Sequence, residues 1–273
     1  MSKILIITTE FISFAGSATG GRGVRLENLA TGLKEHGHTV YFSFLEENYQ
    51  KLKIKPPSEL TKYLHNYFYD DIIETLKPDV ILFSPWTLAI NLRNEKILEE
   101  YCIGIDLPGP LAIENSFEKN EEDIIFAAKK IMALNKADFF LCSTDRQKYY
   151  LLSWLLLSGH SLEKDPIIIC PISCNLYDNS KKIYPKIPEY IFSGVLWPWQ
   201  NYGENLEVIA EYLENKNGLL KTFCSPFIYS NKQNQKNNLS ALDKYKSVKQ
   251  FGLIEHSVLL EHYQTASAAI ELY

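Results

Sequence analysis

The amino-acid sequence predicts an α/β protein with two Rossmann-like domains, each built on a parallel sheet, the second domain being incomplete. Short, unbroken apolar runs alternate along the chain with longer segments of helical periodicity. Unbroken runs are typical of strands that are covered on both faces, and such strands form parallel sheets. A polar stretch at residues 175–189, which holds Pro185 and Pro188, interrupts the alternation, and the pattern restarts at Tyr190.

The apolar runs are the predicted strands, and their alternation with helices indicates right-handed crossovers. Before the polar stretch these runs are Ile4–Thr8, Val40–Phe44, Val80–Phe83, Tyr101–Ile105, Phe139–Cys142 and Ile167–Cys170. After it they are Ile191–Val195, Thr222–Cys224, Val248–Phe251 and Ala268–Leu272. The predicted helices carry apolar residues three and four positions apart, as in Leu26–Leu33, Leu60–Tyr67 and Leu206–Leu213.

These elements predict a domain order. Residues 1–174 form an N-terminal Rossmann-like domain, residues 175–189 a linker, and residues 190–273 a partial C-terminal domain. The last predicted strand reaches Tyr273 without a helix to cover it, which would leave apolar surface exposed. We therefore expect either a truncated product or a covering helix from a partner chain.

Composition excludes several classes of function. The chain has 273 residues, 46% of them apolar and 22% charged, with a net charge of −5 and a pI of about 5.8. No basic stripe is present, which argues against nucleic acid as a partner. The apolar start is too short for a signal peptide, and no run approaches the roughly 20 residues that span a bilayer, so a cytoplasmic protein is expected. The helix predicted at Tyr149–Leu157 is apolar nearly all round, which indicates burial between domains or, as an alternative, peripheral membrane contact.

The cysteines and histidines form no recognisable metal or catalytic group, and neither a metal nor a cofactor is expected. Cys170 and Cys174 lack a zinc spacing, and no second pair accompanies them. Gly37 and His38 are predicted to end a helix and enter a strand. The remaining histidines are interpreted as mostly surface residues: His36, His65, His160, His256 and His262.

The first strand–helix connection carries the strongest candidate binding residues. Gly20 and Gly21 let a ligand approach the backbone at the start of a helix, whose free N–H groups favour an anion. Arg22 and Arg25 add positive charge, so a phosphate group is predicted there. A flexible loop closed by glycines is the alternative. A nicotinamide site is a weaker one, for which Glu46 and Glu47 would supply the ribose-binding acid.

Further candidates follow other predicted strands, where α/β proteins bind their ligands. Trp86 follows Val80–Phe83, and the loop from Asp106 to Glu114 follows the next strand. Asp106 and Glu114 are predicted to bind substrate hydroxyls, with a turn cap as the alternative for Asp106. Trp199 opens the second domain and is predicted to stack on a sugar or base, or else to pack between the domains.

Together these residues resemble the family 4 glycosyltransferases, and the resemblance covers nearly the whole chain. The segments that carry it are Ile4–Thr8, Gly20-Gly21, Leu29–Val40, Lys77–Ile81 and Ala137–Ser143 with Arg146 and Tyr150. The Asp106–Glu114 loop and the Gly194–Asn201 segment are similar to a bacterial subgroup involved in surface polysaccharides.

The resemblance implies a GT-B fold and a retaining, metal-independent transfer of a hexose from a nucleotide sugar to a glycan or lipid-linked acceptor. By position, Gly20 and Gly21 would approach the donor diphosphate, and Asp106 would be the catalytic candidate beside the sugar. The segment Trp197–Tyr202 lacks the basic pair of many relatives, so Arg22 and Arg25 would meet the phosphate charge. A donor-binding Glu-x7-Glu segment of the family is expected beyond Tyr273. A non-catalytic remnant or binding module that needs a partner chain is therefore the alternative, with an NAD-dependent enzyme as a weaker one.

Overall fold

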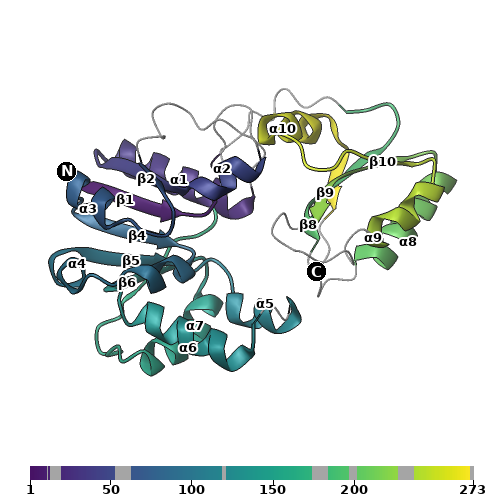
Figure 1. Cartoon of the computed structure of the whole chain (residues 1–273). Helices are drawn as coiled ribbons and strands as arrows, with labels where there is room; N and C mark the ends of the chain where they lie inside the picture. Colours follow the sequence, from purple (N-terminus) through teal and green to yellow (C-terminus); the bar gives the residue numbers. More distant parts are fainter. Residues whose placement is uncertain are drawn as a thin grey trace. The chain divides into compact units, whose positions relative to one another are not determined.

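The protein divides into two compact units, each with its own parallel sheet. The computed structural model describes residues 1–10, 12, 20–52, 63–118, 121–173, 184–196, 202–226 and 237–270. Unit 1 comprises Met1–Ile12 and Gly21–Cys174, and unit 2 comprises Ser13–Gly20 and Asn175–Tyr273. Helices accompany the strands in both units (Figure 1).

Unit 1 is built on a seven-stranded sheet with the order β3-β2-β1-β4-β5-β6-β7. All neighbouring strands are parallel. The strands are β1 (Lys3–Thr8), β2 (Thr39–Leu45), β3 (Leu64–His65), β4 (Val80–Ser84), β5 (Cys102–Asp106), β6 (Phe139–Cys142) and β7 (Ile167–Ile169). Every predicted strand of this half is therefore confirmed, within one or two residues at its ends.

The helices of unit 1 connect these strands. They are α1 (Gly21–Glu35), α2 (Glu46–Leu52), α3 (Asp70–Leu76), the 3-10 helix η2 (Trp86–Asn91), α4 (Glu95–Glu100), α5 (Leu111–Glu118), α6 (Asp123–Leu134) and α7 (Asp145–Leu157). The chain reverses after α1 at Gly37, whose φ is 84°. The backbone N–H of Gly37 donates to Lys34 O at 2.9 Å and that of His38 to Leu33 O at 3.0 Å. The predicted helix end at Gly37 and His38 is confirmed.

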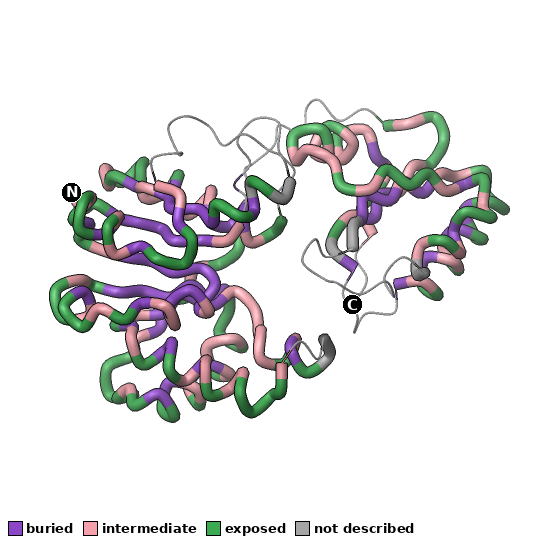
Figure 2. Tube along the Cα trace, in the orientation of Figure 1, coloured by how far each residue is buried: buried purple, intermediate pink, exposed green. Residues whose placement is uncertain are grey.

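The core of unit 1 lies along its central strands, which Figure 2 shows as buried. Leu5, Ile6 and Ile7 of β1 are each 0% exposed, as is Phe83 of β4. Burial of a large aliphatic or aromatic side chain stabilises a fold by about 1.5 to 3 kcal/mol. These strands are continuous apolar runs in the sequence because helices cover both faces of the sheet, so that residues on both faces are buried.

Helix α7 forms as predicted, but only part of its apolar surface is buried. Leu151 and Leu155 are 2% and 0% exposed and join the core of unit 1. Tyr149, Leu156 and Leu157 are 71%, 63% and 64% exposed. Within unit 1 only one face of α7 is packed against the core. Burial of the three exposed residues between the domains therefore stays a prediction.

The helix predicted at Leu60–Tyr67 is wrong over its last residues. Leu64 and His65 form the edge strand β3, which pairs in parallel with Phe44 and Leu45 of β2. Tyr67 then takes a positive φ of 70°, which a helix does not allow. The pairing partner lies about twenty residues away in the sequence, so local periodicity could not report it.

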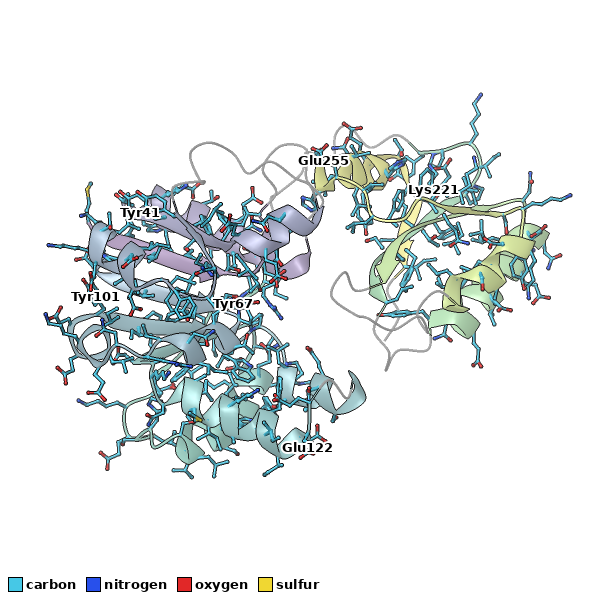
Figure 3. All side chains as sticks on the ribbon, in the orientation of Figure 1. Tyr41, Tyr67, Tyr101, Glu122, Lys221 and Glu255 are labelled. Carbon is cyan, nitrogen blue, oxygen red and sulfur yellow. The ribbon has the colours of Figure 1, made fainter. Side chains whose placement is uncertain are left out.

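Unit 2 holds a four-stranded sheet with the order β10-β9-β8-β11, again with parallel neighbours. Its strands are β8 (Glu189–Leu196), β9 (Leu219–Pro226), β10 (Val248–Gln250) and β11 (Ala268–Ile270). Its helices are α8 (Tyr202–Asn215), α9 (Asn237–Ser240), η5 (Ala241–Lys244) and α10 (His256–Thr265). Lys221 of β9, labelled in Figure 3, forms an ion pair with Glu189 of β8.

The two sheets repeat one topology. In each, the first strand of the unit stands between its second and fourth strands, so the strand order reverses beside it. The predicted class, an α/β protein of two Rossmann-like halves on parallel sheets, is confirmed. Such a reversal opens a crevice at the carboxyl ends of the strands, which is where α/β proteins hold their ligands.

Candidate functional site

The candidate site of unit 1 lies at the carboxyl edge of its sheet, around the reversal between β1 and β4. β1 ends at Thr8 and β4 at Ser84, and these residues are paired in the sheet register. The next strand, β5, ends at Asp106. Polar side chains thus finish three adjacent strands at one edge, although most of each strand is apolar.

A buried ion pair joins this edge to α1. Arg25 Nε lies 3.1 Å from Asp106 Oδ1 and 3.2 Å from Oδ2, and Nη2 donates to Oδ1 at 3.0 Å. The side chains of Arg25 and Asp106 are only 4% and 0% exposed. The hydroxyl of Ser84 lies 3.4 Å from Asp106 Oδ2. Both carboxylate oxygens are therefore engaged, and the first turns of α1 are fixed on the end of β5.

The charges of this pair are set by burial and by each other. Burial acts to lower the pKa of the Arg25 guanidinium, but its hydrogen bonds and charge interaction with Asp106 outweigh it, so that this pKa is raised. Burial raises the pKa of the Asp106 carboxyl above its ordinary value, and Arg25 opposes that rise. A buried pair of this kind depends on both partners, because either charge alone is left without solvation.

The start of α1 offers an open face. Gly20 and Gly21 are exposed. Among the described residues, and apart from its chain neighbours and the nearby backbone of α1, no atom lies within 4 Å of the position that a side chain on Gly21 would take. No acidic residue stands in the first turn of α1, so its N–H groups face no carboxylate of that turn. Arg22, predicted as a phosphate ligand, donates from Nη1 to Glu10 Oε1 at 2.8 Å and is 23% exposed on its side chain. The structure brings Gly21, Arg22 and Arg25 together on one helix.

The predicted loop from Asp106 to Glu114 is shorter than expected, because α5 begins at Leu111 and Glu114 lies on that helix. Glu114 stays beside the loop: its Oε1 would be 3.2 Å from a side-chain carbon on Gly109. Gln147 of α7 holds the same loop by donating to Pro108 O at 2.8 Å. Glu114 and Asp106 thus flank one short connection after β5.

Trp86, a predicted substrate contact, lies inside unit 1. It is 1% exposed and packs edge-on against Phe126, with the ring centroids 5.1 Å apart. Its indole N–H has no acceptor among the described residues. This position favours a packing role. Trp199, the remaining predicted contact, lies outside the described residues.

Two buried titratable groups were not predicted. His65 was interpreted as a surface residue, but it is 2% exposed. Its Nε2 lies 3.2 Å from Thr8 O, and its Nδ1 accepts from the backbone N–H of Tyr67, labelled in Figure 3. Burial lowers the pKa of His65 to about 4, so the ring is neutral at pH 7 and Nε2 carries the proton. The ring braces the end of β1 next to the site.

Lys130 of α6 is the second such group. It is 1% exposed, and its Nζ lies 4.1 Å from the ring centroid of Trp154 and 4.9 Å from that of Tyr150. Its Nζ also donates to Tyr150 Oη at 3.5 Å. Burial lowers the pKa of Lys130 to about 7. The helical periodicity of α6 does not tell whether a lysine lies on its buried or its exposed face. Only the packing of α6 against α7 shows that the Lys130 side chain is buried.

The described residues show neither a cluster of metal ligands nor a membrane-spanning helix. Within residues 1–10, 12, 20–52, 63–118, 121–173, 184–196, 202–226 and 237–270, no three His, Cys, Asp or Glu side chains gather as a metal-ligand set. The cysteines described there are free thiols: Cys102, Cys142, Cys170 and Cys224. None of the described helices combines the length and hydropathy needed to cross a bilayer.

The arrangement of both sheets recurs in solved structures of known enzymes. The chain is similar to sucrose-phosphate synthase from Thermosynechococcus elongatus, with a TM-score of 0.62 and 11% identity, over 98% of this chain and 75% of that one. It is similar to the catalytic domain of starch synthase IV from Arabidopsis thaliana bound to ADP and acarbose, with a TM-score of 0.63 and 10% identity, over 98% and 77% of the two chains. The chain has the GT-B fold.

The GT-B fold is not confined to transferases. UDP-GlcNAc 2-epimerase from Neisseria meningitidis bound to UDP-GlcNAc matches with a TM-score of 0.57 and 13% identity, over 98% of this chain and 76% of that one. At such identities the likeness concerns the GT-B fold alone. No protein-family model matches the sequence, and no curated protein matches it. The predicted GT-B fold is confirmed, while membership of family 4 and of its surface-polysaccharide subgroup stays a prediction.

Proposed function

We propose that this protein is a glycosyltransferase that moves a sugar from a nucleotide-sugar donor to a glycan or lipid-linked acceptor. The observation that carries the proposal is the open start of α1 beside the strand reversal of a GT-B sheet. Among the described residues nothing crowds the position of a side chain on Gly21, and Arg22, which pairs with Glu10, lies beside it. A donor diphosphate is the anionic group that this combination suits.

The ligands of similar structures agree with that proposal. Starch synthase IV was solved with ADP and acarbose, and an α-glucosyltransferase of TM-score 0.58 with UDP. The finer features rest on the family 4 resemblance: hexosyl transfer with retention, independence of metal, a role in polysaccharide biosynthesis, and residues 1–174 and 190–273 as the acceptor and donor domains. Peripheral membrane contact through the exposed apolar residues of α7 belongs with them.

The predicted site residues take different roles in this proposal. Gly20, Gly21 and Arg22 are proposed to meet the donor diphosphate. Arg25 is held by Asp106, so we propose that both act by positioning the start of α1. Glu114, beside the loop after β5, is the proposed ligand of a sugar hydroxyl.

A sugar-transfer assay with a charge placed at the helix start tests the proposal. Gly21→Asp would set a carboxylate at the first turn of α1, where repulsion should raise the KM for the donor about tenfold, or about 1.4 kcal/mol. Gly32→Asp is the matched control, because Gly32 lies on the same helix and has equal space around it. The full chain is assayed with UDP- and ADP-sugars in the presence of EDTA, and the anomer of the product is read by NMR.

The outcomes separate the alternatives. Transfer with retention, impaired by Gly21→Asp and unchanged by Gly32→Asp, supports the proposal. Epimerisation of UDP-GlcNAc without transfer would assign the fold to its other known chemistry. Equal loss in both variants would remove α1 from the donor site, and no turnover of any nucleotide sugar would favour a non-catalytic binding module.

A further inference from the structure

The segment by which the chain leaves unit 1 is bound by two side chains of α1. This exit segment, Cys170–Ser173, follows β7 and has no regular secondary structure. Arg25 Nη1 donates to Cys170 O at 2.8 Å, and Asn28 Nδ2 donates to Ser173 O at 2.8 Å. Arg25 and Asn28 are nearly one helical turn apart, so they face the same side of α1.

The first of these contacts is preorganised. Arg25 is held in place by the buried carboxylate of Asp106 at three short distances, and a charged donor strengthens its bond to the Cys170 carbonyl. The backbone N–H of Cys170 donates in turn to Cys142 O at 2.7 Å. The end of β5 therefore fixes, through Arg25, the direction in which the chain continues after β7.

These contacts lie next to places where the chain passes from one unit to the other. The chain passes between the two units at three points: after Ile12, at Gly21, where α1 begins, and after Cys174, directly after the exit segment. Exposed irregular segments are ordinarily the most mobile parts of a protein. Here two carbonyls of such a segment are tied to the first two turns of α1 instead.

We propose that Arg25 and Asn28 are positioning residues that clamp the exit segment onto α1, and so hold together, within unit 1, the start of α1 and the segment that ends the unit. The clamp fixes the course of the chain at the end of unit 1. It depends on the fold and on these contacts, and a chain that transferred no sugar would still have it.

Labelling of the Cys170 thiol reports on the clamp. Cys170 is part-exposed and belongs to the exit segment, whereas Cys102 and Cys142 are an exposed and a buried reference in the same molecule. A Cys174→Ser background is used throughout, because Cys170 and Cys174 share one proteolytic peptide. The rate of reaction with N-ethylmaleimide is followed at each cysteine by mass spectrometry on the full chain.

Asn28→Ala should raise the Cys170 rate about fivefold, the factor that corresponds to one ordinary hydrogen bond of about 1 kcal/mol. Thr31→Ala is the matched control, because the Thr31 hydroxyl donates within α1, to Glu27 O at 2.9 Å. Asn28→Gln, which keeps an amide donor, should return the rate toward that of the parent. Arg25→Met combined with Asp106→Leu removes the other contact without leaving a buried charge, and should also accelerate Cys170.

Selective acceleration at Cys170, with Cys102 and Cys142 unchanged, supports the clamp. The proposal is overturned by equal Cys170 rates in Asn28→Ala and Thr31→Ala. It is overturned equally by acceleration at all three cysteines, since that would show general loosening of unit 1.

Discussion

Replacing Arg25 by methionine is expected to lower the free energy of unfolding by about 3 to 5 kcal/mol. The substitution leaves the Asp106 carboxylate inside the protein at 1% exposure without its cation. The loss should be larger at pH 8 than at pH 5, because an unpaired buried carboxyl has a raised pKa and is relieved by protonation as the pH falls. Urea denaturation at the two pH values measures both effects.

Two variants control this experiment. Arg25→Met with Asp106→Leu removes both charges and should recover most of the lost stability. Arg22→Met breaks the part-buried pair with Glu10, whose side chains are 23% and 16% exposed, and should cost about 1 kcal/mol or less. A loss in Arg25→Met no larger than in Arg22→Met would show that the pair does not hold α1 on the sheet.

Replacing Lys130 by methionine is expected to stabilise the protein by about 2 to 4 kcal/mol at pH 6. In the folded state burial lowers the pKa of Lys130 from 10.5 to about 7. Between these values the unfolded chain binds the proton and the folded protein does not, so stability rises with pH by up to about 1.4 kcal/mol per unit. Below pH 7 the folded protein carries the buried charge, and the penalty is complete. Methionine fits among Trp154 and Tyr150 without that charge.

Denaturation curves from pH 6 to 9.5 test this expectation. Tyr150 faces the amine from α7, and burial raises its pKa further from this range. Lys129→Met is the matched control, because that neighbouring lysine is 45% exposed and pairs with Glu121 at the surface. The parent and Lys129→Met should become more stable across the range, and Lys130→Met should lack that component. Parallel curves for all three proteins would contradict a buried amine whose pKa is lowered in the folded state.

The sheet could be predicted because its signal is local. Runs such as Ile4–Thr8 and Val80–Phe83 are apolar on both faces, which only a covered parallel strand explains. The end of α1 could also be predicted from the sequence, because a glycine such as Gly37 readily takes the positive φ that ends a helix. These features are written within a few consecutive residues.

The features that could not be predicted depend on distant partners. The two residues of β3 become a strand only through pairing with β2. The sequence marked Arg25 and Asp106 separately, as a phosphate ligand and an acid, but their ion pair joins positions 81 residues apart. His65 and Lys130 are polar residues, which a sequence pattern places at the surface. In the structure both are buried, because neighbouring elements cover them.

Binding of nucleotide sugars by the full chain tests the central claim most directly. Isothermal titration with UDP-glucose, UDP-GlcNAc, ADP-glucose and NAD compares the two classes of ligand on one sample. The account predicts that at least one nucleotide sugar binds, that Gly21→Asp weakens this binding while Gly32→Asp does not, and that NAD gives no heat. Binding of NAD with no response to any nucleotide sugar would contradict it.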